Sequence, residues 1–219
     1  GKGDGMNKDQ KKYVEAIHKG NERMIKLVGE LVAVSSIESG AGEIHMEMLD
    51  IGVVAKETID LMKKQIKSKA LKLNIDIDED VPKCNADLAS MRAVFQHLLS
   101  NAIKYTAKKG TVSVAISKNG DNLLVSVSDT GYGIEKKDQP KIFTKLFRAD
   151  NVRDKDTDGT GLGLYIVKSI VENSGGKVWF KSLGAGKNPG VTFYVIFPLD
   201  GTKSIKDRPL TSPKLHRKK

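Results

Sequence analysis

The stretch GTGLGLYIV, residues 159–167, decides the fold of this 219-residue chain, because three alternating glycines lead directly into a run of helix-forming residues. A loop that runs straight into a helix directs free backbone N–H groups and the positive end of the helix dipole at one point. A phosphate fits such a point, and glycine lets it approach the backbone closely. A glycine-rich turn that serves packing alone is the alternative. The dinucleotide fingerprint does not fit, because its third glycine would fall at Leu164, and no Gly-Lys-Ser/Thr of a P-loop follows.

Length and composition are those of one sizeable globular domain with an appendage. Hydrophobic residues make up 39% of the chain, and no apolar run approaches the roughly 20 residues that a membrane-spanning helix needs. No signal-peptide pattern opens the sequence. The single cysteine, Cys84, excludes an internal disulfide and fits a reducing compartment. We therefore expect a cytoplasmic domain, and a membrane-bound parent protein stays open.

The formal net charge of +10 raises the question of nucleic-acid binding. Much of this charge lies on helix faces and in the termini, as in the closing KLHRKK. No arginine-rich helix or zinc-ligand spacing accompanies it, and the aromatic fraction is only 5%. We interpret the charge as solvated surface and expect no nucleic-acid partner.

A long helix is predicted from about residue 7 to residue 37, after a flexible lead over residues 1–6. Its apolar residues recur at spacings of three and four, with Asn21 in one slot of the series: Val14, Ile17, Met24, Val28 and Leu31. This is the heptad seam of a coiled coil with one polar, register-setting position. No second helical pattern of matching length follows, so the seam predicts self-association or a partner helix outside the chain. Folding back onto the globular domain is the alternative. The stretch SSIESGAGE, residues 35–43, ends the helix and forms a linker.

The rest of the chain mixes helices with strands that are mostly joined by hairpins, and Asn119-Gly120 is the strongest hairpin signal. The predicted elements are strands over 44–48 and 71–77, helices over 53–69 and 86–106, strands on either side of 119–120, a short helix over 136–147, a helix ending near 173, and a hairpin of 177–182 and 191–197. We predict an α+β fold, a two-layer α/β sandwich in which helices cover a mixed, largely antiparallel sheet. The long helix precedes this fold, and residues 200–219 form a disordered basic tail.

The predicted helix over 86–106 has two faces of different character. Its apolar stripe should pack on the sheet and consists of Leu88, Met91, Phe95, Leu98 and Ala102. A second face carries His97, Asn101, Lys104 and Tyr105 at helical spacing. The amide oxygen of Asn101 can bind Mg²⁺, which prefers hard oxygen donors. Lys104 can meet a phosphate, and Tyr105 can pack near a base. A merely solvated face is the alternative.

The hexapeptide DTGYGI, residues 129–134, directly follows the predicted strand over 123–128. A carboxylate at a strand end can accept a hydrogen bond from the exocyclic amine of adenine, which would select adenine over guanine. Gly131 and Gly133 would let the backbone bend closely around the base. A plain Asp-x-Gly turn is the alternative for this hexapeptide alone.

Taken together and in this order, the motifs resemble the catalytic, ATP-binding domain of sensor histidine kinases. The wider superfamily includes gyrase B, the ninety-kilodalton chaperones and mismatch-repair ATPases. LLSNAIKYT (98–106) resembles the N box, DTGYGI the first glycine box, GTGLGLYIVK the second, and PGVTF (189–193) a degenerate third. KIFTKLFRAD (141–150) is similar to the F box that begins the flexible ATP lid. The resemblance implies an ATP-binding domain over residues 41–199.

The resemblance also implies a role for each matching residue. Asn101 would coordinate Mg²⁺, Lys104 would contact phosphate, and Tyr105 would flank the nucleotide. Asp129 would read the adenine amine, and Arg148 would reach the γ-phosphate. Residues 150–158 would form the lid. The remaining residues implied to surround ATP or ADP are Gly131, Gly133, Ile134, Phe147, Thr160, Gly161, Leu162, Gly163, Leu164 and Thr192, with the backbone of 161–163 cradling the phosphates and Thr192 near the base.

Two positions depart from the family pattern. His97 stands four residues before Asn101, where the kinases usually carry Asn and the gyrase-like ATPases carry a catalytic Glu. A histidine can orient water or accept a proton, so an ATP-hydrolysing enzyme is a second hypothesis, and a polar spacer is the alternative. Leu146 stands where a second F-box Phe is usual, so we expect Phe143 and Phe147 to anchor the lid. A non-catalytic docking scaffold is a third hypothesis.

No histidine of the chain has the setting of the family's phosphoacceptor. The four histidines are followed by Lys19, Met46, Leu98 and Arg217. The helix over residues 7–40 resembles instead the second dimerisation helix, so His18 is expected to be a surface residue and the acceptor helix to lie outside this chain. The resemblance implies a protein histidine kinase that moves the γ-phosphoryl group of Mg·ATP to that acceptor. Its implied partners are the acceptor helix, a second copy of the parent kinase and a response regulator.

Overall fold

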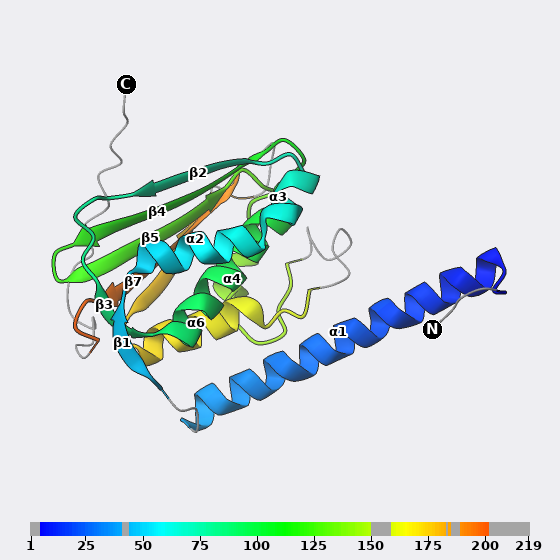
Figure 1. Ribbon diagram of the computed structural model, residues 1–219, viewed down its shortest axis with the longest axis horizontal. Helices are drawn as coiled ribbons and strands as arrows, with labels where there is room; N and C mark the ends of the chain where they lie inside the picture. The colour runs from blue at the N-terminus through cyan, green and yellow to red at the C-terminus, as the bar shows by residue number, and fades with distance from the viewer. Residues whose placement is uncertain (1–4, 41–43, 150–158, 183, 185–188, 202–219) are drawn as a thin grey trace.

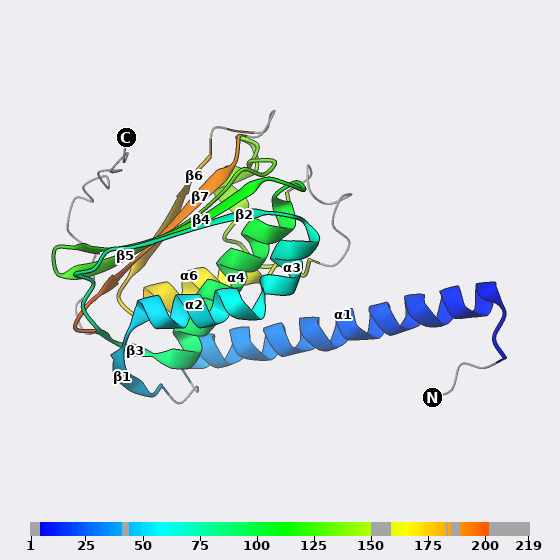
Figure 2. The same cartoon turned by 45° about the horizontal axis from the view of Figure 1, so that its top comes forward.

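The computed structural model describes residues 5–40, 44–149, 159–182, 184 and 189–201. The predicted fold class is confirmed: helices cover one face of a five-stranded sheet, and the long helix α1 (Lys8–Ser39) precedes them (Figures 1 and 2). The predicted lid, 150–158, and most of the predicted basic tail lie outside the described residues. Among the helices described, none combines the length and the apolar character needed to cross a membrane.

The five-stranded sheet has the order β2-β4-β5-β7-β6. Its strands are β2 (Lys72–Ile77), β4 (Thr111–Asn119), β5 (Asn122–Asp129), β6 (Lys177–Lys181) and β7 (Val191–Pro198). Only the β2–β4 pair is parallel. The β4–β5 hairpin turns at Asn119-Gly120 as predicted, since Gly120 adopts the positive φ (62°) that such a turn needs. Asp129 pairs with Val191 at the end of β5.

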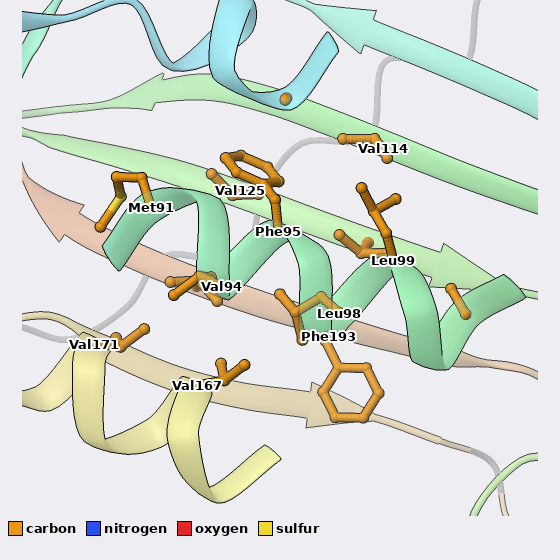
Figure 3. Close-up of a cluster of buried hydrophobic side chains, with 14 of the residues drawn as sticks. Met91, Val94, Phe95, Leu98, Leu99, Val114, Val125, Val167, Val171 and Phe193 are labelled. Atoms are coloured by element: carbon orange, nitrogen blue, oxygen red, sulfur yellow. The ribbon is translucent and has the colours of Figure 1, made fainter. Parts of the chain in front are cut away.

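Within the described residues, four further helices belong to the domain: α2 (Ile51–Leu61), α3 (Lys63–Ser68), α4 (Leu88–Tyr105) and α6 (Gly163–Asn173). The apolar stripe predicted for α4 is confirmed, because Met91, Phe95, Leu98 and Ala102 are all buried. Phe95 and Leu99 point toward the sheet, and Val94 points toward α6 (Figure 3). Helix α4 is therefore the central helix of the core, and its remaining face is free to build a site.

Two local predictions are corrected. The helix predicted from residue 86 begins at Leu88, because β3 (Cys84–Asp87) pairs with β1 (Met46–Leu49) and Asp87 then caps α4 by accepting a hydrogen bond from Ser90 N at 2.7 Å. The helix predicted over 136–147 is only a 3₁₀ turn, Gln139–Lys141. Pro140 has no N–H to donate in a helix and disfavours a helical conformation at the residue before it. Most backbone hydrogen bonds of this segment therefore join residues three apart, as from Lys141 N to Asp138 O, instead of the four of an α-helix.

Helix α1 has one exposed face and one face that is covered by the domain. It begins with a capping box between Asn7 and Gln10, and its N-terminal half extends beyond the domain (Figure 1). The predicted heptad seam stays exposed on α1, from Leu31 at 45% to Ile17 at 71%. Its C-terminal half packs against the domain, where Val34 is only 4% exposed. The exposed seam thus remains available to a partner while the neighbouring face is already covered.

Candidate nucleotide-binding site

A pocket of about 140 Å³ opens where α4, the end of β5, the F-box segment and the start of α6 meet. Most of the residues predicted for the site line it, although they come from segments far apart in the chain. They are His97, Asn101, Lys104, Tyr105, Asp129, Gly133, Ile134, Phe147, Arg148, Thr160, Gly161, Gly163 and Leu164. The fold therefore brings the N box, both glycine boxes and the F box to one cavity.

The polar face of α4 forms one wall of this pocket. Asn101 and Lys104 lie one turn apart on it, and the Lys104 ammonium lies 5.6 Å from the centre of the Tyr105 ring. The end of the helix is fixed from outside by Lys69, whose Nζ donates to the carbonyl oxygens of Ile103, Lys104 and Thr106 at 2.8, 2.6 and 3.0 Å. A cation at a helix C-terminus satisfies carbonyls that have no partner within the helix. This cap holds Lys104 and Tyr105 in place.

Asp129 ends β5 and is the buried acid of the pocket, with 8% of its surface exposed. Its Oδ1 accepts a hydrogen bond from the backbone N–H of Gly131 at 2.8 Å. Burial raises the pKa of the Asp129 carboxyl to about 6, against the opposing effect of the backbone N–H groups of Gly131 and Val191. An acceptor in so dry a site forms a strong and selective hydrogen bond to a donor on a ligand.

Three predicted residues do not line the pocket. Thr192 stands between the lining residues Val191 and Phe193, so its side chain points to the opposite face of the sheet, where its hydroxyl lies 2.9 Å from that of Ser128. Leu162 is completely buried in the core. Gly131 lies behind Asp129, where a Cβ would come within 2.6 Å of the Tyr105 carbonyl oxygen. Gly131 and Leu162 therefore support the wall of the pocket from behind. The side chain of Thr192, predicted to lie near the adenine base, does not face the pocket.

The second glycine box forms the opposite end of the pocket. Gly161 has φ +76°, and a Cβ there would lie 2.7 Å from the Leu146 carbonyl carbon, so this position admits only glycine. Helix α6 begins two residues later, and no described side chain caps it. Its first N–H groups have no partner within the helix and suit an anion.

The F-box segment turns sharply beside the pocket. Leu146 has φ +59° and is 60% exposed, so it points outward. Phe143 packs edge-on against Phe180 and Phe193, with ring centres 6.0 and 6.4 Å apart, and Phe147 lines the pocket. The two phenylalanines expected to act as anchors thus both point inward. A non-glycine residue in the left-handed region is strained, and such strain clusters at functional sites.

His97 lines the pocket beside the start of α6. A Cβ on Gly163 would lie 2.9 Å from the His97 Nδ1, so the imidazole packs against the backbone there. Burial lowers the pKa of His97, while the charge of Glu30 opposes that shift. The histidine is therefore neutral at physiological pH, and its packing favours the spacer role over that of a water-activating base.

Several lining residues were not predicted from the sequence. Ser100, Tyr132 and Ile142 lie beside predicted motif residues, and their side-chain directions depend on the fold. Lys26 and Glu30 come from α1, for which the sequence predicts self-association or a partner helix, with folding back onto the domain as the alternative. No local signal marks them, because their place in the pocket depends on how α1 packs against the domain.

The donor set of the pocket fits Mg²⁺ bound together with a nucleotide. The described residues contain no group of three or more His, Cys, Asp or Glu side chains that would hold a metal ion by themselves. Asn101 lines the pocket and would offer one hard oxygen ligand, and Mg²⁺ usually completes its shell with phosphates and waters.

Comparisons with known proteins show which family the chain resembles in sequence and in fold. The sequence model of the family described as histidine kinase-, DNA gyrase B-, and HSP90-like ATPase matches residues 86–201. The circadian input-output histidine kinase CikA of Synechococcus elongatus is 30% identical over 195 residues, which are 88% of this chain and 26% of CikA. The sensor histidine kinase WalK of Bacillus subtilis is 34% identical over 182 residues, 78% of this chain and 28% of WalK. The chain thus spans about a quarter of these relatives.

Solved structures of histidine kinases share the fold. Full-length ShkA, in complex with AMPPNP, has a TM-score of 0.74 over 91% of this chain and 41% of ShkA, at 24% identity. The catalytic domain of ThkA has a TM-score of 0.63 over 72% of this chain and 98% of that domain, at 25% identity. ThkA in complex with the response regulator TrrA has a TM-score of 0.70 over 90% of this chain and 54% of the ThkA chain, at 22% identity. The family model covers more than half of the chain; the protein belongs to the histidine kinase-, DNA gyrase B- and HSP90-like ATPase family and carries the catalytic ATP-binding domain of a sensor histidine kinase.

Proposed function

We propose that this chain binds ATP with Mg²⁺ in the pocket described above and transfers the γ-phosphoryl group to a histidine on another segment or subunit. The observation that carries the proposal is the convergence of Asn101, Asp129 and the Gly159–Gly163 loop on one cavity. Each group suits a different part of the ligand: the carboxylate the adenine amine, the amide the metal, and the loop the phosphates.

Catalysis by these residues would consist of positioning and charge neutralisation. A neutral acceptor imidazole attacks the γ-phosphorus through a ring nitrogen, the new P–N bond forms, and the bond to the β,γ-bridging oxygen breaks to release ADP. Lys104 and Arg148 line the pocket and would offset the negative charge of the phosphates. Mg²⁺, held by Asn101, would neutralise charge on the phosphate oxygens. The acceptor supplies its own nucleophile, so the pocket needs no strong base.

The partners follow from the same proposal. The exposed heptad seam of α1 fits the acceptor helix and, through it, a second copy of the parent kinase. The ThkA complex supports a response regulator as the protein that receives the phosphoryl group afterwards. The described residues of this chain would supply ATP binding, and the acceptor histidine would come from outside.

The test is incubation of the purified chain with ATP labelled in the γ-phosphate, alone and with a separately made acceptor helix. The label is expected to appear only on the acceptor helix and to be lost in acid, as a phosphohistidine requires. Acid-labile label on this chain alone would overturn the assignment of the acceptor. No label on either partner, despite bound ATP, would overturn the kinase assignment.

ATP hydrolysis through His97 is the competing activity. Phosphate release by the wild type and by His97→Ala distinguishes the two. We expect equal rates near background, because the imidazole packs against Gly163. A rate in the wild type well above background that His97→Ala abolishes would establish hydrolysis instead.

A further inference from the structure

Helix α1 reaches into the nucleotide pocket through one acidic side chain. Glu30 is only 11% exposed, and it lines the pocket together with Lys26. Its carboxylate accepts a hydrogen bond from the hydroxyl of Thr160, inside the second glycine box. A negatively charged group from outside the ATP-binding domain thus contacts the loop proposed to hold the phosphates.

The docked position of α1 is secured at further points around the pocket. Val34 is buried one turn beyond Glu30. The Glu38 carboxylate lies 2.6 Å from the Nζ of Lys145, in the F-box segment, and also accepts a hydrogen bond from the hydroxyl of Tyr165 on α6. Figures 1 and 2 both show α1 running beside α6. The contacts of α1 therefore fall on the second glycine box, the F-box segment and α6, three segments that contribute residues to the pocket.

We infer that Glu30 acts as an internal anion that competes with the phosphates of the nucleotide, so that docking of α1 and binding of ATP oppose each other. This inference rests on the proposed nucleotide site. A carboxylate bonded to Thr160 lies at the end of the pocket where the triphosphate would lie, and two negative groups in a partly buried site repel each other. Release of α1 would remove that repulsion and free the Thr160 hydroxyl.

The other charges near Glu30 do not cancel this effect. Lys26 lies 3.9 Å from the Glu30 carboxylate, but its side chain is 58% exposed whereas that of Glu30 is 11% exposed, so water screens the Lys26 charge more than the Glu30 charge. The pocket is also small: about 140 Å³, against roughly 300 Å³ at the lower end for ligand sites. Part of its wall consists of Lys26 and Glu30, so undocking of α1 would enlarge it.

The effect of Glu30 on affinity should grow with the negative charge of the ligand. Glu30→Gln keeps the shape of the side chain and one acceptor oxygen for the Thr160 hydroxyl but removes the charge. It should bind ATP about tenfold more tightly than the wild type, because loss of one close repulsion is worth that much. The gain should be smaller for ADP and absent for adenosine. Glu22→Gln is the matched control, since Glu22 is an exposed residue of the same helix, beside His18.

The experiment is calorimetric titration of the full chain and both variants with adenosine, ADP and a non-hydrolysable ATP analogue. Equal or weaker ATP-analogue binding by Glu30→Gln would overturn the inference. An equal gain for adenosine would also overturn it, because the effect would then be steric. Failure of the wild type and Glu30→Gln to bind any of the three ligands would refute the nucleotide site itself.

Hydrogen–deuterium exchange of the wild type supplies a second readout on α1. Saturating ATP analogue should speed amide exchange over residues 27–38, because an undocked helix loses its packing against α6, and adenosine should not. Unchanged or slower exchange in that segment with the ATP analogue would contradict the opposition between docking and binding.

Discussion

Oδ1 of Asp129 lies 2.8 Å from the backbone nitrogen of Gly131, and this hydrogen bond orients the buried carboxylate at the edge of the pocket. To read adenine, the carboxylate must accept from Gly131 and from the exocyclic amine at once. A carboxylate accepts on both oxygens, whereas an amide presents one oxygen and one NH₂ group. The hydrogen bond between Asp129 and Gly131 therefore predicts that Asn, the isosteric amide, cannot replace Asp129 in binding adenine.

Replacement of Asp129 by Asn should weaken ADP binding at least about tenfold. The NH₂ group of Asn would face either the N–H of Gly131 or the amine of adenine, so two donors would meet in a dry site. Calorimetric titration with ADP measures this. Asp76→Asn, on the exposed side of β2, is the matched control and should bind ADP like the wild type. Unchanged affinity in Asp129→Asn would refute the role of Asp129.

The buried Asp129 should also make stability depend on pH. Its pKa rises from 3.8 to about 6 on folding, so the folded state binds a proton more tightly than the unfolded state, and stability falls as the pH rises through this window. Between pH 5 and pH 7 the unfolding free energy of the wild type should fall by about 1 kcal/mol relative to that of Asp129→Asn. Urea unfolding of both proteins at the two pH values measures the difference. A difference that is constant, or that grows in favour of the wild type with pH, would contradict the burial of an ionisable carboxyl.

Lys69 should support the site from a distance. Lys69→Met leaves three carbonyl oxygens at the end of α4 without their charged donor, which should cost about 2 kcal/mol of unfolding free energy. It should also weaken nucleotide binding, because Lys104 and Tyr105 lie on the same helical turn. Lys69→Arg should recover part of both losses, and the exposed Lys72→Met should produce neither. Stability loss without any loss of affinity would show that this end of α4 does not position the ligand.

The gain in ADP affinity that Mg²⁺ provides should depend on Asn101. The wild type should bind ADP more tightly with Mg²⁺ than with EDTA, and Asn101→Ala should lose most of that difference because the protein's oxygen ligand is gone. Asn74→Ala, on the exposed side of β2, is the control. An equal gain from Mg²⁺ in Asn101→Ala would mean that the metal is held by other groups.

The part of the site that lies within motifs could be predicted from the sequence. Asn101 and Lys104 share a face because helical spacing alone places them there, and Asp129 lies at a strand end because the alternation of β5 stops there. Glycine at 161 is dictated by its backbone angle and by the close approach of Leu146. The helical spacing, the end of the strand and the backbone angle are local properties, which the residue pattern specifies directly.

The features that the sequence could not supply depend on tertiary packing. Thr192 points away from the pocket because the alternation of β7 gives that side to Val191 and Phe193. Strand β3 is too short to show a period, and the turn at Pro140 replaces a helix whose apolar pattern looked sufficient. Glu30 enters the pocket only because α1 folds back onto α6, a placement that no local pattern encodes.

The measurement that tests the central claim most directly is titration of the unmodified chain with ADP and with GDP in the presence of Mg²⁺. The account predicts saturable binding of one ADP per chain, with GDP at least about tenfold weaker, because the guanine oxygen would face the Asp129 carboxylate where adenine offers an amine. Absence of ADP binding, or equal binding of the two nucleotides, would contradict it.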